Sequence, residues 1–429
     1  MNRRDFIIKS GLSSSIFSIV PSSVLGFNGV SPNNKIQIGF IGAGRQGRGL
    51  MKNFTEYNEC QIIAVSDVDS QKVDFFSEEF ENKILKDNEK NVYIKKFEFY
   101  REMLQNTSVD AVVIATPDHW HAQMSVDSAK YGKDIYCEKP LSSTISEGRA
   151  MVNSARKYKV VYQTGSMQRS WKHFRHAAEL IQNGYIGEIK EVNVAIGDPH
   201  KQCDLPSLKA PDHLNWNEWI GPVPYRGYHP DLACLLEDKR WGQWRNYKPF
   251  GGGMITDFGA HMFDIVQWAL EMDNSGPKLF VPPKKNATLG LSYYYDNEVK
   301  VNHIKWGKGN NEIQFIGSEG KLEVSRRYLR TSPDKSLKDL IIPKNATKRV
   351  YQSDNHHLDW LNSIKNRTRP ICDVEIGHRT ASVCNICNIA YDLQRDLEWD
   401  AKKEIFVGDE SANLLIDRPY RGNWNYKEF

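Results

Sequence analysis

Two separated segments of the chain carry side chains whose types and spacing suit proton transfer. The tripeptide Glu138-Lys139-Pro140 supplies a lysine, and farther along Asp257 and His261 lie four residues apart. On a helix that spacing puts the carboxylate and the imidazole on one face, where the carboxylate can orient the ring and raise its basicity. Such a ring can take a proton from a hydroxyl group. The competing interpretations are a surface ion pair between Lys139 and Glu138 and a helix-capping role for Asp257.

A glycine-rich loop near residue 42 is typical of a dinucleotide-binding site. It reads Gly42-Ala43-Gly44-Arg45-Gln46-Gly47, follows a short apolar run and precedes a helical stretch. Gly42 would permit the tight turn, Gly44 would let the backbone approach a pyrophosphate, and Gly47 would let the helix pack closely on the strand. The start of the helix offers free N–H groups to the phosphates. We therefore predict that Gly42, Gly44, Arg45, Gln46 and Gly47 bind the cofactor.

A carboxylate follows this loop at the distance expected for a ribose-binding residue. Asp67 ends a second apolar run and lies 20 residues beyond Gly47. A carboxylate there accepts hydrogen bonds from the ribose hydroxyls and repels a 2′-phosphate, so the sequence favours NAD over NADP. Asp69, two residues farther on, is a rival for the same role.

Two further strands are predicted to end at the same edge of a sheet. Residues 111–115 run into Thr116, Pro117 and His121, and residues 134–137 run into Glu138. Alternating strands and helices indicate a doubly wound parallel sheet of the Rossmann type, in which ligands bind at the carboxyl ends of the strands. We therefore add Thr116, Pro117, His121 and Glu138 to the predicted cofactor-binding residues.

The Glu-Lys-Pro tripeptide at the end of a Rossmann strand and the Asp-x-x-x-His pair resemble the Gfo/Idh/MocA family over residues 35–429. The resemblance implies that Lys139 lies near the nicotinamide and the substrate hydroxyl, and that Asp257 and His261 act with it as catalytic residues. It also implies an NAD-binding domain (33–162) and a substrate-binding α+β domain (163–429) with a large, open, mainly antiparallel sheet. A helix over about 375–396 would pack back on the first domain, and homo-oligomers are expected.

The second half of the chain is rich in aromatic residues interleaved with polar ones. Ring faces can cover the C–H surfaces of a sugar while polar tips meet its hydroxyls, although core packing explains many single tryptophans equally well. Between residues 325 and 347 the family pattern fades, and we interpret that stretch as a surface excursion. The predicted substrate contacts are Gln168, Arg169, Tyr228, His229 and Trp244.

Composition argues against several other classes of protein. A net charge of +4 over 429 residues, with scattered lysines and arginines, does not favour nucleic-acid binding. No spacing of histidines and carboxylates indicates a metal site. Of the seven cysteines only Cys384 and Cys387 are close, and their segment reads as a helix, so buried unpaired thiols are favoured over a redox or metal pair.

The first residues resemble a twin-arginine export signal. Arg3 and Arg4 precede a short apolar stretch that is too short to span a bilayer, and small residues follow near Gly26. We assign residues 1–32 to this signal and its linker, with the export machinery as a partner and the periplasm as the destination. A basic N-terminal arm with a chance arginine pair is the alternative.

Together these features predict an oxidoreductase that takes a hydride from a C–OH group of a sugar, glycoside or polyol. Free NAD is not expected outside the cytoplasm, so the cofactor would be held tightly and the hydride returned within the cycle. A redox-neutral glycosidase or lyase that works through a 3-keto intermediate is one alternative, and a net dehydrogenase with an external acceptor is another. A non-catalytic sugar-binding protein of the same fold should have lost Lys139, Asp257 or His261, and all three are present.

Overall fold

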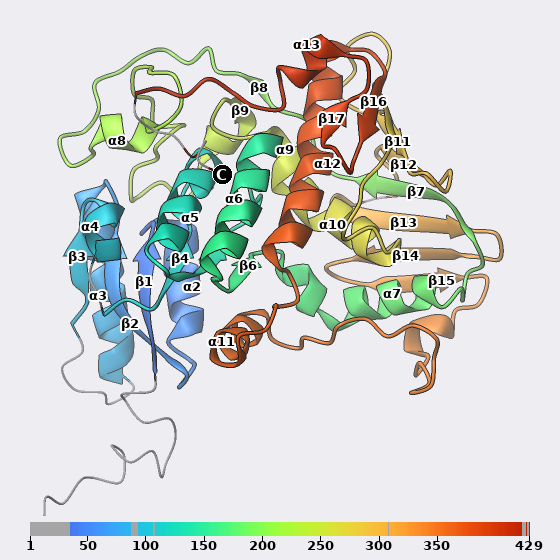
Figure 1. The fold of residues 1–429 in the computed structure, drawn as a ribbon, viewed down its shortest axis with the longest axis horizontal. Coiled ribbons are helices and arrows are strands. Elements are labelled where there is room, and N and C mark those ends of the chain that lie inside the picture. The colour runs from blue at the N-terminus through green and yellow to red at the C-terminus, as the bar shows by residue number, and fades with distance from the viewer. Residues whose placement is uncertain (1–34, 87–92, 106–107, 308, 423–425, 427–428) are drawn as a thin grey trace, which may run out of the picture.

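The structure is a computed structural model that describes residues 35–86, 93–105, 108–307, 309–422, 426 and 429. Two sheets lie side by side with helices packed around and between them (Figure 1). The predicted export signal and linker, residues 1–32, lie outside the described residues. No helix in the described part of the chain is long and apolar enough to cross a membrane.

The N-terminal half is a doubly wound parallel sheet, as predicted. Its six strands lie in the order β3-β2-β1-β4-β5-β6, so the chain reverses direction across the sheet between β1 and β4. A crevice at such a reversal is where nucleotides bind in folds of this class. The strands are β1 (Ile36–Ile41), β2 (Cys60–Ser66), β3 (Lys95–Phe97), β4 (Ala111–Ile114), β5 (Asp134–Cys137) and β6 (Tyr162–Thr164). The helices are α2 (Arg45–Phe54), α3 (Ser70–Lys86), α4 (Tyr100–Gln105), α5 (His121–Lys130) and α6 (Ile145–Tyr158).

The side chains of this sheet explain why it is covered on both faces. Every residue of β4 and β5 is buried, as expected for central parallel strands between two helical layers. The helix α6 begins with a capping box, in which the Thr144 hydroxyl accepts from Glu147 N while the Glu147 carboxylate accepts from Thr144 N. The predicted domain boundary at residue 162 falls within β6, the last strand of the sheet.

The second half contains the large, mainly antiparallel sheet that the family resemblance implied. Its nine strands lie in the order β15-β14-β13-β7-β12-β11-β10-β16-β17, and only β7 and β12 pair in parallel. The strands are β7 (Ile189–Ala195), β10 (Leu279–Val281), β11 (Ser292–Tyr294), β12 (Lys300–His303), β13 (Glu312–Gly317), β14 (Lys321–Ser325), β15 (Leu329–Ser332), β16 (Leu397–Asp400) and β17 (Ile405–Phe406).

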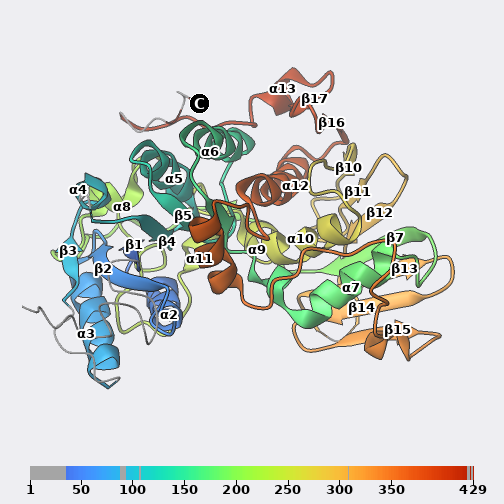
Figure 2. The same ribbon diagram turned by 60° about the horizontal axis from the view of Figure 1, so that its bottom comes forward.

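Only one face of this sheet is covered by helices (Figure 2). Apolar side chains of α7 (Lys172–Gln182), α10 (Gly259–Ala269) and α12 (Val374–Leu393) pack against strand residues such as Val192, Tyr293 and Phe315 in one core. On the other face Asn193 bonds across strands to Asn302 and Gln314. Alternation of apolar and polar residues thus produced the half-covered sheet expected of antiparallel strands. The remaining elements are α8 (Trp216–Ile220), α9 (Gly253–Asp257), α11 (His356–Asn366), α13 (Glu410–Asn413), β8 (Lys201–Gln202) and β9 (Tyr247–Lys248).

C-terminal segments complete the core of the N-terminal half. Trp360 of α11 is fully buried and packs edge-to-face on Phe54 and Tyr136, whose residues belong to the first domain. The tail residue Tyr426 is buried in the core that contains α5 and α6. Arg418 of the same tail lies 2.5 Å from the buried carboxylate of Glu147. The two halves therefore share their apolar interior.

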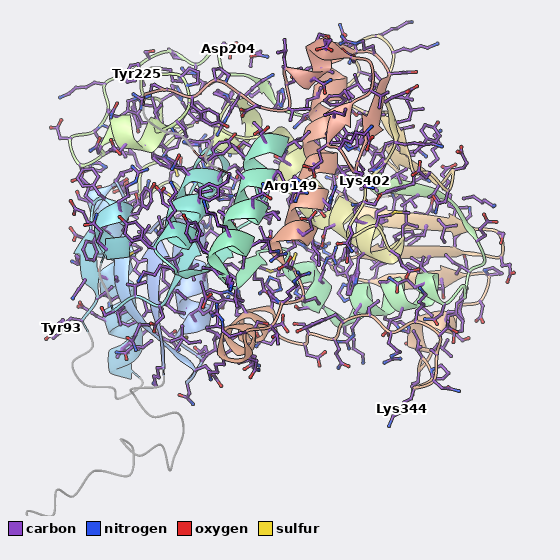
Figure 3. The ribbon with its side chains drawn as sticks, viewed as in Figure 1. Tyr93, Arg149, Asp204, Tyr225, Lys344 and Lys402 are labelled. Carbon is purple, nitrogen blue, oxygen red and sulfur yellow. The ribbon has the colours of Figure 1, made fainter. Side chains whose placement is uncertain are left out.

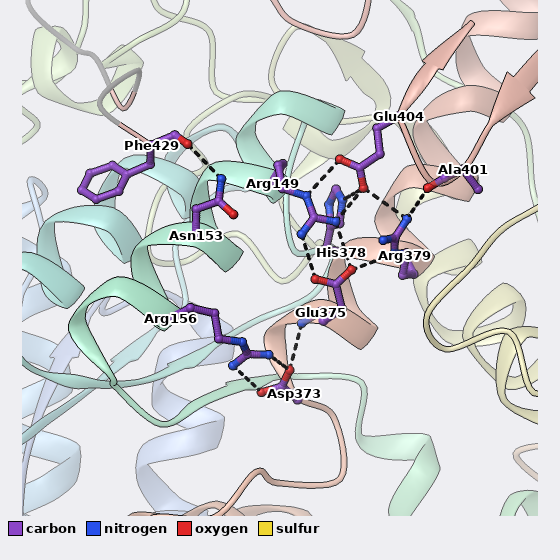
Figure 4. A network of polar contacts seen from close by, with 10 residues as sticks. All are labelled: Arg149, Asn153, Arg156, Asp373, Glu375, His378, Arg379, Ala401, Glu404 and Phe429. Carbon is purple, nitrogen blue, oxygen red and sulfur yellow. Dashed lines mark hydrogen bonds and ion pairs between the residues drawn. The ribbon is translucent and has the colours of Figure 1, made fainter. Parts of the chain in front are cut away.

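A polar network also fastens α12 to α6 (Figure 4). Arg149 of α6 donates to Glu375 of α12 and to Glu404, and His378 Nε2 lies 2.7 Å from the same Glu404. In Figure 3 Arg149 lies between the two helices, whereas Lys344 extends from the far end of the second half. Cys384 and Cys387 of α12 are fully buried and unpaired.

Candidate active site

A cavity of about 1230 Å³ lies where the two halves meet at the carboxyl ends of the parallel strands. Its walls come from the glycine-rich loop, from the ends of β2, β4 and β5, and from α9, α10 and the loop after β14. The loop over residues 232–246 of the second half forms a further wall. The cavity thus brings together segments that are far apart in the sequence.

The geometry of the glycine-rich loop fits a bound dinucleotide. Gly42 has φ +103°, and a Cβ there would lie 2.7 Å from the backbone oxygen of Ala115. A Cβ at Gly47 would lie 2.0 Å from the oxygen of Gly42, so α2 packs too closely on the loop for any other residue. A Cβ at Gly44, in contrast, would meet no atom within 4 Å, and Gly44 lines the cavity. The space beside Gly44 and the start of α2 can therefore receive a pyrophosphate.

Asp67, rather than its rival Asp69, faces the cavity. Its Oδ2 accepts a hydrogen bond from Ala43 N at 2.7 Å, and its Oδ1 accepts one from Asp69 N at 3.0 Å. Burial raises the pKa of Asp67, against the opposing charge of Lys72. Asp69 is buried beside Lys72, 3.0 Å from its Nζ. Of the two acids, only Asp67 therefore lies where the predicted ribose-binding residue would have to be.

Four of the other predicted cofactor residues line the cavity directly: Arg45, Gln46, Thr116 and Pro117. Glu138 lines it as well, and its Oε1 accepts from Gln46 Nε2 at 2.9 Å. His121 does not line it. Its ring is buried with Nδ1 2.8 Å from Pro140 O and Nε2 3.1 Å from Thr116 O, and burial lowers its pKa to about 4. A neutral ring can donate to only one of these oxygens, and His121 positions the two cavity-lining segments instead of contacting a ligand.

Lys139 and Asp257 form an ion pair in the cavity. The lysine Nζ lies 2.5 Å from Asp257 Oδ1 and donates to the Asp257 backbone oxygen at 3.0 Å. Arg245 Nε lies 3.4 Å from the other carboxylate oxygen. Burial raises the pKa of Asp257, but Lys139 and Arg245 outweigh burial, and the net pKa lies below its ordinary value. Asp257 is therefore held as a carboxylate.

The predicted contact between Asp257 and His261 is not formed. The helix α9 ends at Asp257 and α10 begins at Gly259, so the two residues do not share one continuous helix. The carboxylate of Asp257 is directed to Lys139 and Arg245. His261 lines the same cavity, and its Nδ1 is buried without a hydrogen-bond partner in the described structure. Burial, together with the nearby cations, lowers its pKa well below the ordinary value, so the imidazole is neutral.

Of the predicted substrate contacts, only Trp244 lines the cavity. Gln168 is buried behind the wall, where its Oε1 accepts from Arg326 Nε at 2.7 Å. Arg169 is buried and paired with Asp264 at 2.8 Å and with Asp273 at 2.7 Å, so its role is structural. Local sequence gave no sign that its guanidinium turns into the core instead of toward the ligand.

Tyr228 and His229 also lie away from the cavity. Tyr228 packs edge-to-face on Trp216, and its hydroxyl donates to Ala233 O at 3.2 Å. His229 Nδ1 accepts from Asp231 N at 3.1 Å. Both residues support the loop over 232–246, which does line the cavity, and neither contacts it directly.

Among the charged residues that line the cavity and that sequence reasoning missed, Asp118, Arg245 and Arg326 act on the charge of Asp257 or share its charge partners. Asp118 follows Thr116 and Pro117 directly, so its strand-end position was a usable signal. It is buried, and burial raises its pKa well above the ordinary value. Arg245 adjoins the predicted Trp244. Arg326 had no such signal, since it lies in the stretch interpreted as a surface excursion. It is exposed, as that interpretation implies, and it also lines the cavity.

The parallel sheet, the glycine cradle and the lysine–carboxylate pair define a nucleotide-dependent oxidoreductase. Comparison with protein families agrees: an oxidoreductase-family NAD-binding Rossmann fold matches residues 36–166, and the C-terminal alpha/beta domain of the same family matches residues 199–426. The chain therefore belongs to the Gfo/Idh/MocA oxidoreductase family, and its cofactor is NAD.

Individual relatives are similar over parts of the chain. The myo-inositol 2-dehydrogenase of Thermotoga maritima is 27% identical over 164 residues, 38% of this chain and 46% of that protein. A glycosyl hydrolase family 109 protein of Shewanella woodyi is 33% identical over 138 residues, 31% of this chain and 28% of that protein. The chain matches less than half the length of the first of these relatives.

Among solved structures, the scyllo-inositol dehydrogenase of Lactobacillus casei with bound NAD(H) and scyllo-inositol has a similar fold. The TM-score is 0.55 at 17% identity, over 85% of this chain and 99% of that one. At this identity the similarity establishes the shared fold.

Proposed function

We propose that this NAD-dependent oxidoreductase acts on a hydroxyl group of a sugar, glycoside or polyol. The supporting observation is that Lys139, Asp257 and His261 line the same cavity as the nucleotide-binding loop. Groups that can move a proton would therefore share one space with a bound cofactor. NAD, when bound, supplies the acceptor for the hydride. The similarity to an inositol dehydrogenase favours a polyhydroxylated substrate.

The chain's own residues divide the proton chemistry between them. Lys139 is ion-paired with Asp257, so as an ammonium group it can donate a hydrogen bond to the substrate oxygen and orient it. His261 is neutral, so one of its ring nitrogens can accept the hydroxyl proton. We assign the base to His261 and the orienting donor to Lys139. Asp257 fixes the lysine and balances its charge.

We further propose that the protein is exported folded to the periplasm through the twin-arginine route and keeps its cofactor there. Arg3 and Arg4 ahead of a short apolar stretch are the basis for this assignment. A cofactor that cannot be resupplied must stay bound, and the hydride it receives must return to a substrate within the cycle. Homo-oligomers are the expected assembly, because one face of the large sheet carries no helices.

A redox-neutral glycosidase or lyase is the second candidate. Its support is the 33% identity to a glycosyl hydrolase family 109 protein over 138 residues. Such an enzyme would oxidise a ring hydroxyl to a 3-ketone with transfer of the hydride to NAD, and would then lose the neighbouring C2 proton to a base as the glycosidic group leaves C1. A glycosidase would next add water across the C1–C2 double bond and return the hydride to C3, whereas a lyase would return the hydride and keep the double bond. A net oxidation would instead accumulate reduced cofactor.

The first test is whether NAD(H) accompanies the full-length protein purified from the compartment to which it is delivered. The protein is unfolded, and the released nucleotide is quantified by mass spectrometry and absorbance, with the Gly44→Ala variant as control. Near-stoichiometric NAD(H) in the wild type, but not in the Gly44→Ala variant, would support retention of the cofactor. Sugars and glycosides are then added, and reduced cofactor is compared with released aglycone to separate the two candidates. Nucleotide-free protein with weak affinity for added NAD would refute retention and leave an ordinary dehydrogenase.

A further inference from the structure

Arg326 is a cation at the cavity wall that the proposed chemistry does not use. It lies in the turn between β14 and β15 and is exposed to the cavity. Its guanidinium lies over the rings of Trp171 and Phe258, 5.6 Å and 5.2 Å from their centroids, and its Nε donates to Gln168 Oε1 at 2.7 Å. Three neighbours thus fix the side chain. Within the described structure its Nη1 and Nη2 make no hydrogen bond or ion pair.

The charges at this end of the cavity leave Arg326 without a counter-ion. No carboxylate of the described residues lies within 4.0 Å of it. Asp257, the acid that acts on its charge, is already paired with Lys139 and Arg245. Asp118 and Glu138 also line the cavity, but burial raises the pKa of both carboxyl groups and favours the uncharged acids. The cations Lys139 and Arg245 are therefore paired with Asp257, and no carboxylate of the described residues balances the charge of Arg326.

We propose that the substrate is a sugar acid whose carboxylate binds the free Nη1 and Nη2 of Arg326. The proposal rests on the proposed function, because it names the substrate class of the same site. The planar fork of a guanidinium matches a carboxylate through two parallel N–H···O bonds, and the two aromatic rings hold the fork in place. Lys139 remains free to meet the hydroxyl that reacts. A neutral sugar leaves the positive charge of this wall uncompensated.

Binding to the NAD-loaded, full-length protein tests this without requiring turnover. Dissociation constants are measured by calorimetry for three matched pairs: glucuronate and glucose, galacturonate and galactose, and methyl β-glucuronide and methyl β-glucoside. We expect at least one acid to bind about fivefold or more tightly than its neutral partner at low ionic strength. The preference should shrink in high salt, since the pair is partly exposed. Arg326→Met should abolish it, and Arg326→Lys should keep part of it.

Arg330→Met is the matched control, because Arg330 is exposed on β15 over the ring of Tyr328, 4.1 Å from its centroid, and does not line the cavity. It removes the same charge and should leave the preference intact. Equal binding of acid and neutral sugar in all three pairs overturns the proposal, as does a preference that survives Arg326→Met or is lost equally in Arg330→Met. A failure of the proposed function is distinguished by a second measurement: sugars, acidic or neutral, would bind but would not transfer hydride to the bound NAD.

Discussion

Replacing Gly44 with alanine should weaken NAD binding without lowering the stability of the fold. Gly44 has φ −66° and ψ −173°, which an alanine adopts without strain, and its Cβ would project into open space. The free energy of unfolding without ligand should therefore stay constant or rise by up to about 1 kcal/mol, since alanine restricts the unfolded chain. The same methyl group occupies the space where the backbone should approach the pyrophosphate.

The expected loss of NAD affinity follows from the contacts that the methyl group prevents. Losing one charge-assisted hydrogen bond to a phosphate costs about 1.5–3 kcal/mol, or about ten- to 150-fold in Kd. Calorimetric titration with NAD measures the affinity, and urea unfolding of the nucleotide-free protein measures the stability. Glycine at position 47 offers the opposite case, because its Cβ would lie 2.0 Å from a backbone oxygen and alanine there should destabilise the fold itself.

Gly49→Ala is the matched control, because Gly49 is an exposed residue of α2 whose Cβ would also meet nothing within 4 Å. It should stabilise the helix by about 0.5–1 kcal/mol and leave NAD binding unchanged. Wild-type affinity in the Gly44→Ala variant would refute the assignment of the pyrophosphate to this loop. Equal destabilisation by Gly44→Ala and Gly47→Ala would refute the distinction drawn from the geometry.

Lys139→Met should lower kcat by about 10²–10⁴-fold with little change in NAD affinity, as measured by substrate consumption and by calorimetric titration. Acid should destabilise the protein: burial lowers the pKa of His119 and of His356 to about 3. The unfolded chain gains protons at these rings below about pH 6.5 and the folded chain does not, so stability falls as pH drops toward 3, by about 2 kcal/mol per ring at about pH 5 in urea unfolding. Arg418→Met should cost about 3–5 kcal/mol in the same assay, because Glu147 stays buried without its counter-ion.

Each of these expectations has an outcome that contradicts it. A lysine variant with full kcat would remove Lys139 from the chemistry. Stability that does not change between about pH 5 and 7 would contradict the neutral state of the buried histidines. Arg395→Met removes exposed contacts with Asp409 and Ser411 and should cost less than about 1 kcal/mol. An equal loss in this variant and in Arg418→Met would contradict the importance of burial.

The parts of the site that sequence predicted are those fixed by local geometry. The glycine loop and Asp67 follow adjacent strands of one parallel sheet, so their spacing along the chain determines their position in space. Lys139 follows β5, a further parallel strand of the same sheet, in the same way. The doubly wound parallel sheet and the large, open, mainly antiparallel second sheet were predicted for a similar reason, because periodicity and family resemblance reflect backbone architecture.

The parts that sequence missed depend on which way a side chain faces. Arg169 belongs to a polar stretch after a strand, but two carboxylates from α10 and the following loop draw it into the core. A helix break at Phe258 turned Asp257 toward Lys139 and away from His261. Arg326 lies in the turn between β14 and β15, which pair with each other, and β14 also pairs with the neighbouring β13. Its contact with the cavity depends on which distant segments lie opposite that turn, and no local pattern encodes this.

The packing of C-terminal segments into the core of the first domain has a consequence for biosynthesis. The first domain leaves the ribosome before Trp360, Arg418 and Tyr426 have been synthesised. Until then the apolar residues that Trp360 and Tyr426 cover are exposed, and Glu147 lacks its ion-pair partner Arg418. The nucleotide cavity is likewise incomplete until the residues of the second half that line it have been made. We therefore expect loading with NAD to follow translation of Arg326, the last described residue of the cavity wall, and of Trp360 and Arg418, which cover the first domain.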